Sequence, residues 1–439
     1  MRGEHRLSGV FTGSRERSPR RRWRIGWLLG LGIIVNYFDR VNLSVSHAAL
    51  VTTFGISNIM FGYLSGAYNW TYAMCQLPVG VILDRIGVRR VGRISTFIWS
   101  VASFAAAATP NLGGFFGARF LLGVGEAPTF PASAKAVGHW FPEKERSLAT
   151  AMFDSSAKLG LAIGAPLIGV LLLRLGWRWS FALTGVASLL YFVLFSAVYC
   201  EPEEDVKLTE AERQTIQQGT DAADDTPPAA SLGSLLRQRK VVGLSIGFGA
   251  YNYVFYLLLA WLPSYLSSAL HVDLLHSFLY TGVPWLVATA VELVTSSMAD
   301  RLICRGWNAS HVRRVALIGG TALGLGILGA AHAHTAVRAL AWISLSMSGL
   351  SVASPIAWSV PALIVPRGSV GRVSGTINFC GQASGICAQI LTGYIVTWTH
   401  SYALVFIVPA IYLAIGICSY FFLLGRIERI APEPVAAAG

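Results

Sequence analysis

Charged residues are scarce in this chain: they make up 13% of its 439 residues, whereas soluble domains carry about 25%. Its six cysteines lack the Cys-x-x-Cys spacing of a zinc site, so we expect reduced, small core residues and neither a metal nor a cofactor. The sequence also shows no Ser/His/Asp constellation and no phosphate-binding glycine loop, which argues against an enzyme. With 54% hydrophobic residues, the composition predicts a polytopic, all-α integral membrane protein.

The net charge of +12 has two interpretations, a face that binds nucleic acid and a signal for membrane topology. Lys and Arg cluster at the ends of apolar stretches, which favours the second interpretation and predicts no nucleic-acid partner. With the N-terminus in the cytoplasm, the loops on the opposite side hold only Arg174, Arg178 and Arg338. This imbalance predicts a multi-pass membrane protein with cytoplasmic N- and C-termini.

Apolar stretches of about 20 residues, the length that crosses a bilayer, occur twelve times. They cover residues 25–49, 57–83, 92–109, 112–137, 147–173, 178–200, 241–269, 276–299, 312–333, 336–365, 371–398 and 402–425. One long polar segment separates the first six from the last six. The predicted organisation is a basic cytoplasmic N-terminal tail (1–24), an N-terminal six-helix half (25–200), a cytoplasmic linker (201–240), a C-terminal six-helix half (241–425) and a cytoplasmic C-terminal tail (426–439).

A short motif that occurs once in each half indicates an internal duplication. The segment from Gly80 to Arg90 follows the second apolar stretch, and a shorter Asp-Arg version follows the eighth. A carboxylate and guanidinium pair at the cytoplasmic mouth can hold two halves together in one state and part in another, and such a basic loop also orients the chain. We therefore predict a gate built from Asp84, Arg85, Arg89, Arg90, Asp300 and Arg301.

Asp39, Arg40 and Glu126 are charged residues that lie deep within apolar stretches. Asp39 and Arg40 are neighbours in the first stretch, where each charge costs at least about 2.5–3.5 kcal/mol unless it faces protein or water. Glu126 lies near the middle of the fourth stretch, where Pro128 predicts a kink. A carboxyl group whose cationic neighbour is alternately engaged by a substrate and released can carry a proton, so Asp39 and Glu126 are the predicted proton-coupling residues. The alternatives are a static Asp-Arg pair that only holds the first span against the fourth, and a structural buried Glu.

Other polar residues within the apolar stretches leave two interpretations each. Arg119 either binds an anion, for which its forked guanidinium is suited, or is a structural partner of another charge. Asp154 and Lys158, at i and i+4, form either a self-neutralised pair or part of a substrate site. Asn252, among aromatic residues, either lines a cavity or packs within the bundle. Glu292 either faces the cytoplasmic cavity or pairs with a basic residue at the gate.

Several motifs resemble those of a known transporter family. The segment Gly80 to Arg90 resembles the signature of the major facilitator superfamily. Three further motifs resemble those of one family within it, the anion:cation symporters. They are Asn36-Tyr-Phe-Asp-Arg-Val-Asn-Leu-Ser44, Gly123-Val-Gly-Glu-Ala-Pro-Thr-Phe-Pro131 and Asn378-Phe-Cys-Gly-Gln382. The similarity extends from about Trp23 to Arg429. It implies twelve transmembrane helices in two six-helix halves around a central cavity, and a monomeric secondary transporter that works by alternating access.

The resemblance also implies roles for individual residues. In sugar-acid transporters of this family, the protonatable pair falls on Asp39 and Glu126, and the arginine that holds the substrate carboxylate falls on Arg40. Further positions that match substrate contacts are Tyr37, Tyr72, Arg119, Ser354, Trp358 and Asn378. Departures from the family pattern occur where Gln382 replaces an Asn and where charged residues occupy the fifth span. The additional cavity residues that we predict are Asn252, Asp154, Lys158 and Gln382.

These observations predict proton-coupled symport of a small organic anion, in particular a sugar acid such as a hexonate, hexuronate or aldarate. Importing a monoanion against an inside-negative potential costs about 2.3 kcal/mol per 100 mV, so one proton cancels the charge and a second drives uptake. Three alternatives remain at the level of the sequence: coupling to sodium, transport of an aromatic carboxylate, and a non-transporting sensor on the same scaffold.

Overall fold

The computed structural model describes residues 21–217, 232–365 and 367–430, without the side chains of a few helical residues, Asp84 and Asp300 among them. These ranges contain helices and no strand. The helices are α1 (Arg21–Val45), α2 (His47–Phe54), α3 (Asn58–Ala108), α4 (Leu112–Glu126), α5 (Thr129–Trp140), α6 (Glu143–Leu175), α7 (Trp177–Val198), α8 (Glu210–Gln217), α9 (Leu232–Arg237), α10 (Arg239–Ser264), η1 (Tyr265–Ala269), α11 (Leu274–Cys304), α12 (Ala309–Gly324), α13 (Ile327–Ala331), α14 (Ala336–Ile364), α15 (Arg367–Thr399), α16 (Ala403–Ser419) and η2 (Tyr420–Leu424).

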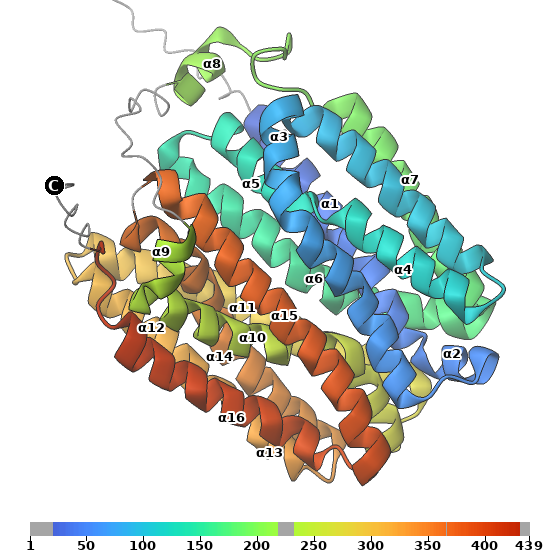
Figure 1. Ribbon diagram of the computed structural model, residues 1–439. Coiled ribbons are helices and arrows are strands. Elements are labelled where there is room, and N and C mark those ends of the chain that lie inside the picture. Colours follow the sequence, from blue (N-terminus) through green and yellow to red (C-terminus); the bar gives the residue numbers. More distant parts are fainter. Residues whose placement is uncertain (1–20, 218–231, 366, 431–439) are drawn as a thin grey trace, which may run out of the picture.

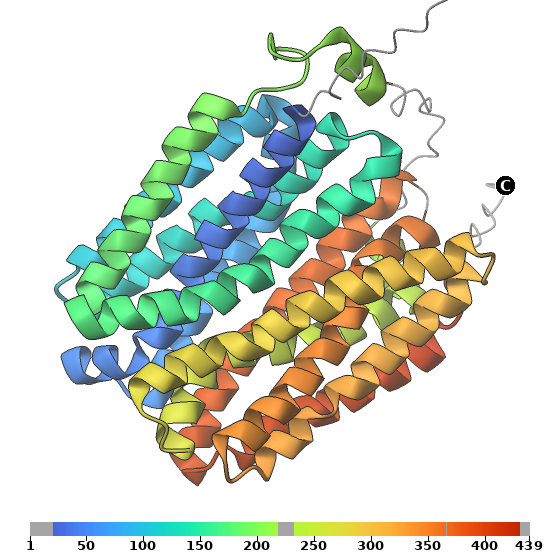
Figure 2. The same cartoon turned by 180° about the vertical axis from the view of Figure 1, so that it is seen from behind.

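Two groups of helices lie side by side (Figures 1 and 2). In the first group, α3 packs against α4 and α7, and α1 packs against α6. In the second group, α10 packs against α15 and α16, and α12 packs against α14. The groups meet where α3 touches α15, α6 touches α11 and α1 touches α10. This is the all-helical, two-part bundle that the sequence predicts.

The number of uninterrupted spans differs from the twelve predicted stretches. Ten helices of the described ranges are long and apolar enough to cross a membrane, and an eleventh is counted if His47–Phe54 and Asn58–Gln76, bent by 117°, form one span. The difference has a local cause. Residues 112–137 are divided between α4 and α5 at Pro128, which lacks an N–H, and the second stretch enters the count only through the bent pair. The helix is interrupted directly after Glu126, at the place where the sequence predicts a kink.

Gly87 turns the chain within α3, between the second and third apolar stretches. Its φ of 78° and ψ of 166° lie in a region that L-residues with a Cβ avoid, which explains a glycine at this point of the motif. The backbone N–H groups of Val88 and Arg89 then donate to the Glu201 carboxylate at 3.0 and 3.2 Å. The turn is thereby attached to the segment that follows α7.

Short polar residues begin several helices, as helix capping requires. The side chains of Asn111, Asp273 and Asn308 accept hydrogen bonds from the backbone N–H three residues later, at 2.8, 3.1 and 3.0 Å. Thr209 accepts from the N–H of Glu212 at 3.4 Å at the start of α8. These caps end the loops and set where each neighbouring helix starts.

Ion pairs tie the beginning of α1 to the first part of the predicted linker. Arg21 Nε lies 2.7 Å from Asp205, while Arg22 binds Glu145 at 2.7 Å and Glu212 at 3.1 Å. The hydrogen bonds from Arg22 hold the pKa of Glu145 below its usual value. Burial raises the pKa of Asp205, but hydrogen bonds led by the one from Arg21 outweigh it and leave that pKa below its usual value. Residues 201–217 are thus attached to the first helix group, and residues 218–231 of the predicted linker lie outside the described ranges.

The cysteines are free, as expected, but the expectation that all are core residues is wrong. Cys304, Cys387 and Cys418 are exposed on the surface of the bundle. The surface of a membrane bundle faces lipid, so a small apolar side chain there needs no burial within the protein.

One end of the bundle, here called the tail side, carries the start of α1, α8 and the described end at Ile430; the opposite end, the far side, carries α2 (Figure 1). The two helix groups are in close contact on the far side. His47 Nδ1 lies 2.6 Å from the Ser264 hydroxyl, and a Cβ on Gly62 would come within 2.7 Å of the Gln389 carbonyl oxygen. Backbones this close indicate a conformation that is closed on the far side.

Candidate functional site

A cavity with about 580 Å³ of empty space lies between the two helix groups. Its wall comes from α1, α3, α5 and α6 on one side and from α10, α14 and α15 on the other. Ten residues predicted from the sequence line it: Tyr37, Arg40, Tyr72, Asp154, Lys158, Asn252, Ser354, Trp358, Asn378 and Gln382.

Arg40 is the centre of the cavity's charge. Its Nε donates to Glu126 Oε2 at 2.9 Å, and the Tyr68 hydroxyl donates to the same oxygen at 2.7 Å. The guanidinium carbon lies 4.5 Å from the ring centre of Tyr37, with Tyr68 and Tyr72 at 4.9 and 5.2 Å. Aromatic faces attract a cation, and Arg40 and Glu126 are 3% and 0% exposed, so this pair is strongly shielded from water.

Asp39 lies on a different face of α1 from its neighbour. It is 1% exposed, and its two carboxylate oxygens accept hydrogen bonds from Ser103 of α3 at 2.7 Å and from Ser188 of α7 at 2.9 Å. Consecutive helical residues point about 100° apart, which separates the two charges. The structure therefore pairs Arg40 with Glu126 and not with its neighbour Asp39.

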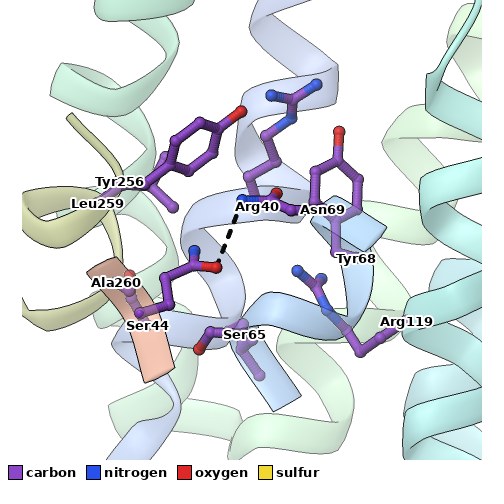
Figure 3. Close-up of a pocket in the computed structure, with 11 residues that line it drawn as sticks. Arg40, Ser44, Ser65, Tyr68, Asn69, Arg119, Tyr256, Leu259 and Ala260 are labelled. Atoms are coloured by element: carbon purple, nitrogen blue, oxygen red, sulfur yellow. Dashed lines mark hydrogen bonds between the residues drawn. The ribbon is translucent and has the colours of Figure 1, made fainter. Parts of the chain in front are cut away.

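A smaller pocket adjoins the main cavity, and Arg40 lines both (Figure 3). Arg119, predicted as a substrate residue, lines this smaller pocket. Its Nη1 lies 3.5 Å from the backbone oxygen of Asp39, and its guanidinium carbon lies 5.3 Å from the Tyr68 ring centre. On the side of this pocket opposite Arg119, the Asn69 amide donates to the Gln389 side chain at 3.4 Å and so joins the two helix groups. Arg119 thus places a second buried cation next to Arg40.

A second charged group lies where α6 meets α11. Lys158 forms an ion pair with Glu292 of α11, and its Nζ lies 3.6 Å from Asp154 on its own helix. Asp154 and Lys158 pair with each other, and both also line the main cavity. Glu292 was expected to face the cytoplasmic cavity or to bind a gate residue; its partner is instead Lys158, within the bundle.

The predicted gate residues lie on the tail side. Arg85, Arg90 and Arg301 are exposed, and Arg89 donates to Glu204 at 2.8 Å within the first helix group. The side chains of Asp84 and Asp300 lie outside the described residues. The gate thus stays a prediction.

Two other predicted cavity residues make hydrogen bonds that define their orientation. Asn378 of α15 donates to Gln76 of α3 at 3.3 Å, a contact between the two helix groups. Asn252 donates to the Phe248 carbonyl at 2.9 Å, one turn earlier on α10. The first contact joins the halves across the cavity, and the second keeps the Asn252 amide against its own helix.

Sequence reasoning missed several residues that complete the site. Tyr68 lies one turn before Tyr72 on α3, so helical spacing from that predicted residue would have identified it. Tyr256, four residues after Asn252 on α10, lines both pockets. Ser103 and Ser188 carried no usable signal, because hydroxyl side chains are common in membrane helices and usually bond to their own backbone.

Comparisons with known proteins agree with this architecture. A family model described as "Major Facilitator Superfamily" matches residues 29–388. The chain is 37% identical to the uncharacterized transporter YybO of Bacillus subtilis over 429 residues, covering 96% of this chain and 99% of that protein. It is 31% identical to a D-galactonate transporter of Escherichia coli O6:H1, covering 94% and 97%. It is also 31% identical to the probable galactarate/D-glucarate transporter GudP of Bacillus subtilis, covering 93% of each.

Solved structures share the fold at low sequence identity. A D-xylose-proton symporter matches with a TM-score of 0.72 at 15% identity, covering 92% of this chain and 98% of that one. A bacterial homologue of the human lysosomal transporter Spinster, in an inward-facing and occupied conformation, matches with a TM-score of 0.72 at 16% identity, covering 93% and 99%. These two matches support the fold alone.

Proposed function

This chain belongs to the major facilitator superfamily, and from that premise we propose that it imports a small organic anion, in particular a sugar acid, together with protons. It is an integral membrane transporter of that superfamily and not an enzyme. The observation that carries the proposal is Arg40, a cation in the wall of the main cavity whose partner is Glu126 at 2.9 Å.

A substrate carboxylate that enters the cavity competes with Glu126 for Arg40. The guanidinium presents a fork that matches a carboxylate, and Tyr37 and Tyr72 flank it in the same wall. When the substrate takes this position, Glu126 loses its cationic partner in a site shielded from water. An isolated carboxylate there is costly, so binding of the anion favours protonation of Glu126.

The charges around α1 balance before substrate enters. Arg40 and Arg119 oppose Asp39 and Glu126, all of them buried. One bound monoanion therefore adds one uncompensated negative charge, which one proton on Asp39 or Glu126 cancels. A second proton makes the membrane potential favour uptake, at about 2.3 kcal/mol per 100 mV. Two carboxyl groups meet this need, so we infer that more than one proton accompanies each substrate.

The opposite wall supplies groups for the rest of the substrate. Ser354, Asn378 and Gln382 present hydroxyl and amide groups to the cavity, and Trp358 adds an aromatic face. Such groups suit the hydroxyls of a sugar acid. Relatives named as a D-galactonate transporter and a galactarate/D-glucarate transporter support this class over an aromatic carboxylate.

We place the tail side in the cytoplasm of a bacterium and the far side outside its inner membrane, on the charge imbalance of the loops. The structure is then closed to the outside. Residues 25–200 and 241–425 form the two six-helix halves, joined by the linker 201–240, and their relative movement exposes the cavity alternately. The gate residues Asp84, Arg85, Arg89, Arg90, Asp300 and Arg301 act at the cytoplasmic mouth, and a single chain suffices as the transporter.

Uptake by purified protein in proteoliposomes tests the proposal. Labelled hexonates, hexuronates and aldarates are offered with a proton gradient, a sodium gradient or neither. We expect the proton gradient alone to drive accumulation, and Asp39→Asn to retain exchange but lose accumulation because it removes one proton carrier. Normal accumulation by that variant would overturn the proton assignment. Binding without flux in the wild type would favour a sensor, and a response to sodium alone would contradict proton coupling.

A further inference from the structure

The ion pair between Lys158 and Glu292 joins the two halves away from the proposed proton-coupling residues. Lys158 belongs to α6 of the first helix group and Glu292 to α11 of the second, and their side chains are 3% and 4% exposed. Charges buried to this degree are retained in membrane proteins only with partners or a function. This pair therefore needs an explanation beyond the binding of substrate at Arg40.

Lys158 has an alternative partner that Glu292 lacks. Asp154 lies one turn earlier on the same helix, with its Oδ2 at 3.6 Å from the Lys158 ammonium, and its side chain is 22% exposed. Asp154 and Lys158 move together because they share a helix, whereas Glu292 moves with the other half. When the halves part along α6 and α11, Lys158 keeps Asp154 as its counter-ion, and Glu292 loses its cation.

The contact between α6 and α11 belongs to the closure of the far side. Gly282 of α11 lies directly against the Ala162 carbonyl of α6, so closely that a Cβ would not fit. Opening of the far side, as alternating access requires, must separate these helices. The ion pair is thus formed in the conformation described here and is broken in the opposite one.

Other groups around Glu292 do not replace Lys158. The titratable groups that face it are Lys158 and Asp154 of α6 and Tyr251 of α10. α14 also packs against α11. Its Ser354 forms a hydrogen bond with Tyr251, and the serine hydroxyl does not titrate near neutral pH. A tyrosine hydroxyl is neutral at physiological pH and cannot balance a carboxylate.

We propose that Glu292 is a further proton carrier, ionised while it binds Lys158 with the far side closed, and protonated when the far side opens. An isolated carboxylate within the bundle is costly, so separation from Lys158 makes Glu292 take a proton from the outside. Closure restores the ammonium beside it, and the proton leaves toward the tail side. This inference rests on the proposed function, because it assumes a transport cycle between the two conformations.

The test measures the charge moved per substrate in proteoliposomes, from the membrane potential at which net substrate flux is zero. Glu292→Gln keeps the shape of the side chain and remains neutral in both conformations. We expect it to move one charge fewer per substrate, while exchange of labelled for unlabelled sugar acid continues. At about 100 mV this lowers the accumulation ratio roughly 50-fold. Glu210→Gln, the same substitution at an exposed position of α8, is the matched control and leaves both values unchanged.

A second variant covers the case in which Glu292→Gln alone fails to fold. Glu292→Met replaces the carboxyl group by an apolar side chain of similar length and leaves Lys158 beside Asp154, so it also moves one charge fewer. The inference is overturned if either variant transports with the charge per substrate of the wild type, or if both fold and neither exchanges substrate. Absence of any sugar-acid flux in the wild type would instead refute the proposed function.

Discussion

Replacement of Glu126 by Gln should separate substrate binding from proton binding. In the wild type, a substrate carboxylate must displace Glu126 from Arg40, and the displaced group takes up a proton. Above the pH at which Glu126 ionises, affinity therefore falls about tenfold per pH unit, or about 1.4 kcal/mol. Glu126→Gln has no charge to displace, so its affinity stays constant with pH. At neutral pH the variant binds substrate more tightly than the wild type.

The same substitution should destabilise the empty protein. Glu126 and Arg40 are almost completely buried, and removal of one partner of such a pair costs about 3–5 kcal/mol because it leaves an uncompensated charge. The three tyrosine rings around Arg40 offset part of this cost. A bound carboxylate replaces the lost partner, so substrate should raise the thermal stability of the variant more than that of the wild type.

Calorimetric binding across about pH 5 to 8 measures the predicted slopes. Tyr68→Phe is the matched control, because it removes one hydrogen bond to Glu126 but keeps the carboxyl group, and it should retain the pH dependence of the wild type. A slope in Glu126→Gln equal to that of the wild type would show that the linked proton binds elsewhere. Weaker binding by the variant at every pH would refute the competition for Arg40.

Three further predictions concern the cavity, the far side and the tail side. Arg40→Lys loses the forked donor and should raise KM for the sugar acid roughly tenfold to a hundredfold in uptake assays, and an unchanged KM would refute a carboxylate contact. In Gly62→Val, the added side chain prevents α3 from packing as closely against α15, so the far side should stay open. An impermeant thiol reagent should then label a cysteine introduced by Ser65→Cys faster from that side, and unchanged labelling would contradict the closure described here. Hydrogen bonds from Arg22 lower the pKa of Glu145, so they stabilise the folded protein by under about 1 kcal/mol. This stabilisation is fully present above the pKa that Glu145 has in the unfolded chain, and it is lost as the pH falls through the pKa of Glu145 in the folded protein. Thermal unfolding of wild type and Glu145→Gln should therefore differ at neutral pH and converge in acid, and a difference that persists in acid would argue against this pair.

Most of the fold was predictable from hydropathy, because a span of about 20 apolar residues is a local property of the chain. The exceptions are local too. Pro128 divides the fourth stretch into α4 and α5, and Gly87, whose φ and ψ are not helical, separates the two helical parts of α3 at a kink. The residues of the main cavity were predicted largely from motifs, and ten of them do line it. Arg119 was placed correctly near the site but faces the smaller pocket.

By itself, the sequence determined that charges lie within membrane spans and that the chain forms a two-part helical bundle, and it predicted Arg40 in the wall of the cavity that the structure contains. Only the tertiary structure decided which charges are partners. Arg40 binds Glu126, 86 residues away, while its neighbour Asp39 binds serines of α3 and α7, and Lys158 reaches across to Glu292. The physical reason is that hydropathy and helical periodicity act along one segment, whereas an ion pair depends on how separate helices are rotated and packed against each other.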